Sequence, residues 1–145
     1  MTQEDKDLLL KDLCARLPYG VRMFEIEPIN DIQSNLTLYS ITNKKSVICI
    51  TPSGGIVGSS VDAFKPYLFP LSSMTEEQRE EFLNIQTEER QILLNALIEY
   101  KSGKYDKIPI IAPYKQIEWL NKNHFDYRGL IPMGLAIDCT NLNIY

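Results

Sequence analysis

The segment Ser46-Val47-Ile48-Cys49-Ile50-Thr51 decides the fold, because four successive apolar residues stand here between two polar ones. A short run that is apolar on both faces is typical of a strand inside a sheet, covered on both sides or on one side plus a partner. Two further β-like runs, 21–27 and 36–42, precede it, and the short polar connection over 42–45 favours an antiparallel hairpin. We therefore expect the centre of the sheet at 46–51.

Helical patterns flank these strands. Thr2 is suited to cap a first helix, whose apolar face includes Leu10. After the strands, a capping box at 75–78 begins a short helix, 88–102 has clear helical spacing, and Pro113 suits the first turn of one more helix. The sequence thus places its strands before most of its helices.

This order of elements predicts an α+β fold. We expect an N-terminal helix, a mostly antiparallel sheet of three to five strands, three helices packed on one face of that sheet, and a short C-terminal strand around 135–137. With 145 residues and no linker or repeat, the chain is predicted to form a single domain over 1–145.

Composition and charge limit the function. A net charge of −4 provides no general basic face, so we expect no binding to duplex nucleic acid. The chain has no apolar run of membrane-spanning length and begins with acidic residues, which predicts a cytoplasmic protein without a membrane segment or secretory signal. Cys14, Cys49 and Cys139 lie far apart among apolar residues, which predicts buried, reduced thiols rather than a disulfide or zinc site. We predict no metal and no cofactor.

A glycine-rich segment, 53–60, follows the third strand-like run. Its small residues suit a loop or a glycine-bent strand, and the main-chain N–H groups of Gly54 and Gly55 could cradle an anion. The segment does not match a phosphate-binding loop, because no lysine follows before Lys65.

The next segment, 64–71, combines aromatic residues with two prolines. Proline fits an edge strand or an extended covering segment better than a central strand. Lys65 and Tyr67 could instead hold or stack on a nucleotide. The acidic residues that follow are interpreted as a solvated helical surface that could attract a basic protein; they are Glu76, Glu77, Glu80, Glu81, Glu88 and Glu89.

The densest run of chemically active side chains contains the only histidine. His124 and Asp126 could perform acid–base catalysis, and Arg128 beside Tyr127 could hold a phosphate. A structural interpretation explains the same residues: His124 caps the preceding helix as a cation, Asp126 pairs with Arg128, and Phe125 and Tyr127 fill the core. The functional interpretation requires His124 and Arg128 to be exposed in a cleft.

Two segments carry a family resemblance: Phe64-Lys65-Pro66-Tyr67-Leu68-Phe69-Pro70-Leu71-Ser72-Ser73-Met74-Thr75, and Trp119-Leu120-Asn121-Lys122-Asn123-His124-Phe125-Asp126-Tyr127-Arg128-Gly129-Leu130-Ile131 continued by Gly134-Leu135-Ala136-Ile137-Asp138. They resemble the KPxLxPLSxLT and WLxxxHFDxxGLIxxGLAID patterns of small uncharacterised proteins encoded by phages and prophages of gut bacteria. The resemblance implies an intracellular accessory factor made in a bacterial host cell during infection, and it transfers no catalytic residue.

We therefore expect a non-enzymatic phage or prophage accessory protein that binds a host protein or a small anionic ligand, with counter-defence as one role. A homo-oligomer is compatible with this expectation. One alternative is a small hydrolase or nucleotide-processing enzyme that uses His124. Another is a nucleotide-binding sponge for a signalling nucleotide, with ligand contacts from Lys65, Tyr67, Tyr127, Arg128, Gly54 and Gly55.

Overall fold

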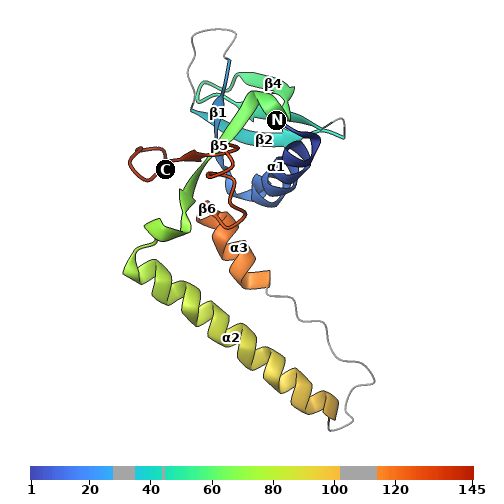
Figure 1. The fold of residues 1–145 in the computed structure, drawn as a ribbon, viewed down its shortest axis with the longest axis vertical. Helices are drawn as coiled ribbons and strands as arrows, with labels where there is room; N and C mark the ends of the chain where they lie inside the picture. Colours follow the sequence, from blue (N-terminus) through green and yellow to red (C-terminus); the bar gives the residue numbers. More distant parts are fainter. Residues whose placement is uncertain (28–34, 44, 102–113) are drawn as a thin grey trace. The chain divides into compact units, whose positions relative to one another are not determined.

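The chain has an α+β fold, as the sequence predicts. The computed structural model describes residues 1–27, 35–43, 45–101 and 114–145. These residues form two compact units: the first contains Met1–Ser73 and Asn121–Tyr145, and the second contains Met74–Leu120. Figure 1 shows the elements of each unit.

The first unit is built on a mixed sheet in the order β4-β3-β2-β1-β5-β6, with β7 also paired to β5. Its strands are β1 (Arg22–Glu25), β2 (Leu36–Ile41), β3 (Ser46–Ile50), β4 (Ile56–Ser60), β5 (Phe64–Pro70), β6 (Phe125–Asp126) and β7 (Ile137–Asp138). β6 and β7 pair with β5 in parallel, and the other pairs are antiparallel. The sheet has more strands than predicted. β7 overlaps the predicted C-terminal strand around 135–137, whereas β6 was not predicted, because a two-residue strand produces no periodic pattern in a sequence.

One face of the sheet is covered by α1 (Gln3–Arg16), which lies beside β1 and β2 in Figure 1. Thr2 and Asp5 form the reciprocal capping box that begins this helix. Leu9 and Leu13 of α1 are fully buried in one core with Val47 and further apolar residues of the strands. Three short 3-10 helices, η1 (Leu17–Tyr19), η2 (Val61–Ala63) and η3 (Leu71–Ser73), complete the unit.

β3 is an internal strand of the sheet but not its centre. The antiparallel β2–β3 hairpin is confirmed. Val47 and Cys49 are fully buried on the side of α1, whereas Ile48 and Ile50 on the other face are only half-buried. The run is therefore apolar on both faces although α1 covers only one.

β5 corrects the prediction of an edge or covering segment, because it lies between β1 on one side and β6 and β7 on the other. Its prolines are tolerated by their positions. Pro66 stands opposite Met23, and the parallel pairing with β7 begins one residue later, at Tyr67. Pro70 is the last residue of the strand. Neither position interrupts a continuous ladder, so β5 can be internal.

The second unit contains α2 (Glu76–Lys101) and most of α3 (Tyr114–Lys122). α2 is a single helix, where the sequence suggests two, at 75–85 and 88–102 (Figure 1). The two helical patterns are separated only by Gln86 and Thr87. Neither residue is a glycine or a proline, so no helix-ending signal stands between the patterns. The predicted helix start at Pro113 lies outside the described residues. Within the described ranges, no helix is both long and apolar enough to cross a membrane.

The three cysteines are free thiols. Cys49 and Cys139 are buried, and burial raises the pKa of Cys49 to about 12 and that of Cys139 to about 11. The prediction is wrong for Cys14, which is exposed on α1. Its neighbours in sequence are apolar, but Cys14 does not share their side of the helix.

Candidate functional site

An ion cluster of Asp12, Arg16 and Arg128 lies in the first unit. Asp12 and Arg16 lie one turn apart on α1, and both are fully buried. Arg16 Nε donates to Asp12 Oδ2 at 2.6 Å and Arg16 Nη2 donates to the carbonyl of Phe125 at 2.8 Å. Arg128 Nε donates to Asp12 Oδ1 at 3.1 Å from the other end of the chain. One carboxylate therefore joins two guanidinium groups and ties the C-terminal segment to the first helix.

Tyr127 completes this cluster. Its ring centre lies 5.6 Å from the guanidinium carbon of Arg16 and 4.8 Å from that of Arg128, within the range of cation–π attraction. The predicted ion pair between Asp126 and Arg128 is wrong. Asp126 instead accepts hydrogen bonds from the main-chain N–H groups of Leu130 at 2.9 Å and Ile131 at 2.8 Å, and so fixes the turn that follows β6.

His124 is part of the packing of the same segment. Its side chain is buried, and its ring stacks on Tyr145 with centroids 4.1 Å apart and an angle of 14° between the planes. Burial, and then the positive charge of Arg16, lower the pKa of His124 to about 4. The ring is therefore neutral at pH 7, so the interpretation of His124 as a cationic helix cap is wrong. A buried, stacked imidazole offers little access to a substrate.

The other predicted ligand contacts lie in different elements. Gly54 and Gly55 form the β3–β4 turn, where Thr51 accepts the N–H of Gly54 at 3.0 Å and that of Gly55 at 2.8 Å. Tyr67 is buried in β5, and its carbonyl accepts the phenol of Tyr145 at 2.8 Å. Tyr127 and Arg128 are thus brought together in the ion cluster, whereas Tyr67 and the two glycines are held by other partners.

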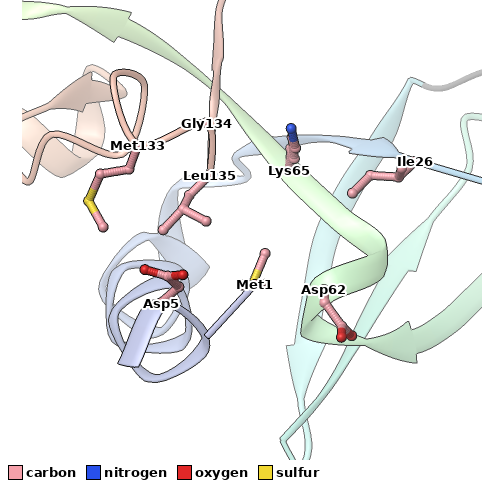
Figure 2. Close-up of a pocket in the computed structure, with 8 residues that line it drawn as sticks. All are labelled: Met1, Asp5, Ile26, Asp62, Lys65, Met133, Gly134 and Leu135. Carbon is pink, nitrogen blue, oxygen red and sulfur yellow. The ribbon is translucent and has the colours of Figure 1, made fainter. Parts of the chain in front are cut away.

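Lys65 lines a pocket of about 420 Å³ in the first unit (Figure 2). Its walls are the side chains or main chain of Met1, Asp5, Ile26, Asp62, Lys65, Met133, Gly134 and Leu135. The carboxylates are already engaged: Asp5 accepts the N–H of Thr2 at 2.8 Å, and Asp62 accepts from Lys6 at 2.5 Å. In Figure 2, the ammonium group of Lys65 points away from Met1 and Asp5. These polar groups do not converge on a common point, as a catalytic or anion-binding array requires.

A surface feature of the second unit was missed in the sequence. α2 carries a stripe of residues spaced three or four apart, which places them on one face of the helix. Leu83, Leu94 and Ile98 in this stripe are 55%, 54% and 65% exposed. We call this surface the α2 outer stripe; it consists of Glu76, Glu80, Leu83, Thr87, Arg90, Leu94 and Ile98. The heptad-like spacing is the signal that identifies it, and division of α2 into two helices concealed it.

α3 contacts a different side of α2. The rings of Phe82 and Trp119 lie 5.6 Å apart, and the main-chain N–H of Lys115 donates to Glu89 at 2.7 Å. Glu89 is consequently buried, which corrects its assignment to the solvated acidic surface. The other predicted acids of α2, Glu76, Glu77, Glu80, Glu81 and Glu88, are exposed.

In the described parts of the chain, no group of three or more histidine, cysteine, aspartate or glutamate side chains is arranged to hold a metal ion. No family model, curated protein or solved structure matches the chain.

Proposed function

We propose that the protein acts by binding, and that the α2 outer stripe docks onto a basic, amphipathic surface of a partner protein. The observation that carries this proposal is the exposure of Leu83, Leu94 and Ile98 along one face of a helix that begins with exposed glutamates. Large apolar side chains exposed on one helix face, here Leu94 and Ile98 one turn apart with Leu83 nearer the glutamates, are typical of a site of protein interaction.

The dimensions of the second unit support this proposal. α2 has 26 residues and α3 has 9. At 1.5 Å per residue these helices are about 39 Å and about 14 Å long, so α3 cannot cover the length of α2. Ile92 and Leu93, beyond the contacts with α3, are 45% and 39% exposed. Helices in water depend on packing of an apolar face for most of their stability, so apolar residues of α2 that the described parts of the chain leave exposed support a partner there.

Charge identifies the chemistry of the partner. Residues 76–89 contain six glutamates and one arginine, and this acidic half adjoins the apolar residues of the stripe. A helix or groove with lysine or arginine at one end and apolar residues along the rest would complement both features. The same glutamates repel nucleic acid and anionic lipid. If the chain is a phage or prophage accessory factor, as its resemblance implies, the partner is a host protein.

The rival functions receive less support from the geometry. A hydrolase or nucleotide-processing enzyme would use His124, which is buried against Tyr145. A nucleotide sponge would use Arg128, whose guanidinium is paired with Asp12. Both side chains have structural partners that account for their positions.

Fluorescence anisotropy with a labelled probe tests the proposal. The probe is a synthetic amphipathic helix of lysine and leucine, and the matched control probe has glutamate in place of lysine. We expect the full chain to bind only the basic probe, with affinity that falls as salt rises. Leu94→Glu should weaken binding at least about tenfold, because it places a charge in the apolar part of the stripe.

The variant Lys11→Gln, at an exposed position of α1, changes the net charge by the same one unit and should bind as the unchanged chain does. Equal binding of the acidic probe, or an unchanged affinity in Leu94→Glu, would contradict the proposal. Binding of the chain to anionic lipid vesicles in preference to the basic probe would replace the protein partner by a membrane.

A further inference from the structure

We propose that β4 is a self-association edge, through which two copies of this chain join their sheets in antiparallel register. β4 is the terminal strand of the sheet, and only β3 pairs with it among the described residues. The inference is independent of the binding proposed for α2, since the two surfaces lie in different units.

The β3–β4 ladder defines which main-chain groups are free. The N–H of Thr51 donates to the carbonyl of Gly55 at 2.9 Å, so this pair begins the alternation of hydrogen-bonded and non-hydrogen-bonded pairs. Val57 and Ser59 then direct their main-chain groups to β3. By the same alternation along the five β3–β4 pairs, the N–H and C=O groups of Ile56, Gly58 and Ser60 point to the open edge of the sheet. These groups can pair with another strand.

Natural edge strands are usually protected by charge, proline or a covering segment. β4 contains no proline or charged residue, and none of residues 46–61, which include β3 and the connecting turn, is charged. Ile56 is 72% exposed, next to half-buried Ile50 on the face opposite α1. In a chain of net charge −4, this neutral hairpin is a surface that a second copy can approach without charge repulsion.

The geometry favours a closed dimer. With a two-fold axis at Gly58, Ile56 of each copy pairs with Ser60 of the other, so all outward main-chain groups meet outward groups. Gly58, on the axis itself, has no side chain that could separate the two strands. The opposite end of the sheet offers only the two-residue strands β6 and β7, so pairing through β4 leaves no equivalent long edge for further copies.

Sedimentation velocity on the full chain, over a concentration series to roughly 100 µM, tests the inference. We expect a shift from monomer to dimer as concentration rises. Gly58→Glu should weaken the dimer at least about tenfold by facing two carboxylates across the axis. A side chain fits at this position in the monomer, where an added Cβ would meet its nearest atom, Ile48 Cγ1, at 3.7 Å.

Ile56→Lys is the second variant, and its side chain is already exposed, so the fold tolerates it. Ser72→Glu is the control, because it adds the same charge as Gly58→Glu at an exposed site outside β4. A chain that remains monomeric throughout the series would overturn the inference, as would a dimer that Ile56→Lys leaves intact. A dimer abolished by Leu94→Glu would assign the association to α2 instead.

Amide exchange of the unchanged chain gives a second readout. The N–H groups of Val57 and Ser59 should be protected at every concentration, because β3 accepts them. Those of Gly58 and Ser60 should become protected only when the dimer forms. Protection of all four groups at low concentration, or exchange of Gly58 and Ser60 that is independent of concentration, would contradict strand pairing at this edge.

Discussion

The two units of this protein distribute charge and apolar surface in opposite ways. In the first unit, Asp12 and Arg16 are fully buried and bonded to one another. In the second, Leu83 and Leu94 are more than half exposed on α2. A charge buried in a protein needs a partner of opposite charge beside it, whereas an exposed apolar side chain is stabilised when another molecule covers it. The side chains of the histidine segment have partners inside the first unit, and the interaction surface that we propose lies on the less conspicuous helix.

The largest effect should come from the buried charges. Asp12→Asn removes the carboxylate that, in the described part of the chain, joins Arg16 and Arg128, and it puts a neutral amide between the two guanidinium groups. We expect the free energy of unfolding to fall by about 3–5 kcal/mol, measured by urea denaturation followed by circular dichroism.

Asp7→Asn is the matched control, because Asp7 pairs with Lys45 at 2.6 Å but is 53% exposed. Its effect should be much smaller than that of Asp12→Asn, because solvent screens an exposed ion pair. Equal stability of Asp12→Asn and Asp7→Asn would contradict the structural role of the ion cluster.

His124 predicts a specific pH dependence of the first unit. Its pKa is about 4 in the folded chain against an ordinary 6.5. Above pH 6.5 the ring is neutral in both states. As pH falls towards 4, the unfolded chain binds a proton that the folded chain does not, so stability is lost over this window, on the order of 3 kcal/mol.

Asp5, Asp7, Asp62 and Asp138 also have lowered pKa values and lose stabilisation in acid, so the measurement must isolate the histidine. His124→Asn does so, because asparagine tolerates the positive φ of 58° and does not titrate. The difference in unfolding free energy between the two chains should shrink from pH 7 to pH 4. If the unfolding free energies of the two chains change in parallel with pH, His124 is not held in its neutral form.

Much of the first unit could be predicted from the sequence where the signal is local, and the failures involve contacts between residues far apart in the chain. The capping box at Thr2 and the β2–β3 hairpin are short-range signals, so both were found. β7 overlaps the predicted C-terminal strand around 135–137 at Ile137. β6 was not predicted, because it forms through long-range pairing with β5 and two residues leave no periodic pattern in the sequence.

The candidate site was harder to predict, because its partners are distant in sequence. Arg128 was expected to pair with nearby Asp126, but it contacts Asp12, 116 residues away. The stacking of His124 on Tyr145 likewise depends on how the C-terminal segment returns. His124, Asp126 and Arg128 are close in sequence, which suggested a reactive group. In the folded chain each of them contacts a different partner.

A smaller effect is expected at the border of the ion cluster. The side chain of Arg128 is 20% exposed, whereas that of Arg16 is fully buried. Arg128→Gln should lower the free energy of unfolding by about 1–2 kcal/mol, because water can partly replace its hydrogen bond to Asp12. Thermal denaturation of Arg128→Gln and of Arg16→Gln compares the stability lost in each variant. A larger loss in Arg128→Gln would contradict the expectation that the more deeply buried arginine matters more.

The smallest effect should be found on α2. Leu94→Ser removes an exposed side chain and should change the free energy of unfolding by less than about 0.5 kcal/mol. Leu13→Ala, at a fully buried leucine of α1, should cost about 2–5 kcal/mol in the same urea titration. A large loss in Leu94→Ser would show that Leu94 supports the fold and is not reserved for a partner.

Hydrogen–deuterium exchange of the full chain, with and without the basic lysine–leucine probe, shows whether α2 or the histidine segment binds the probe. We expect the probe to slow exchange across residues 76–98 of α2 and to leave exchange at residues 121–130 unchanged, as binding through the α2 outer stripe requires. Slower exchange at 121–130 with no change in α2 would contradict it, because the binding surface would then lie at the histidine segment.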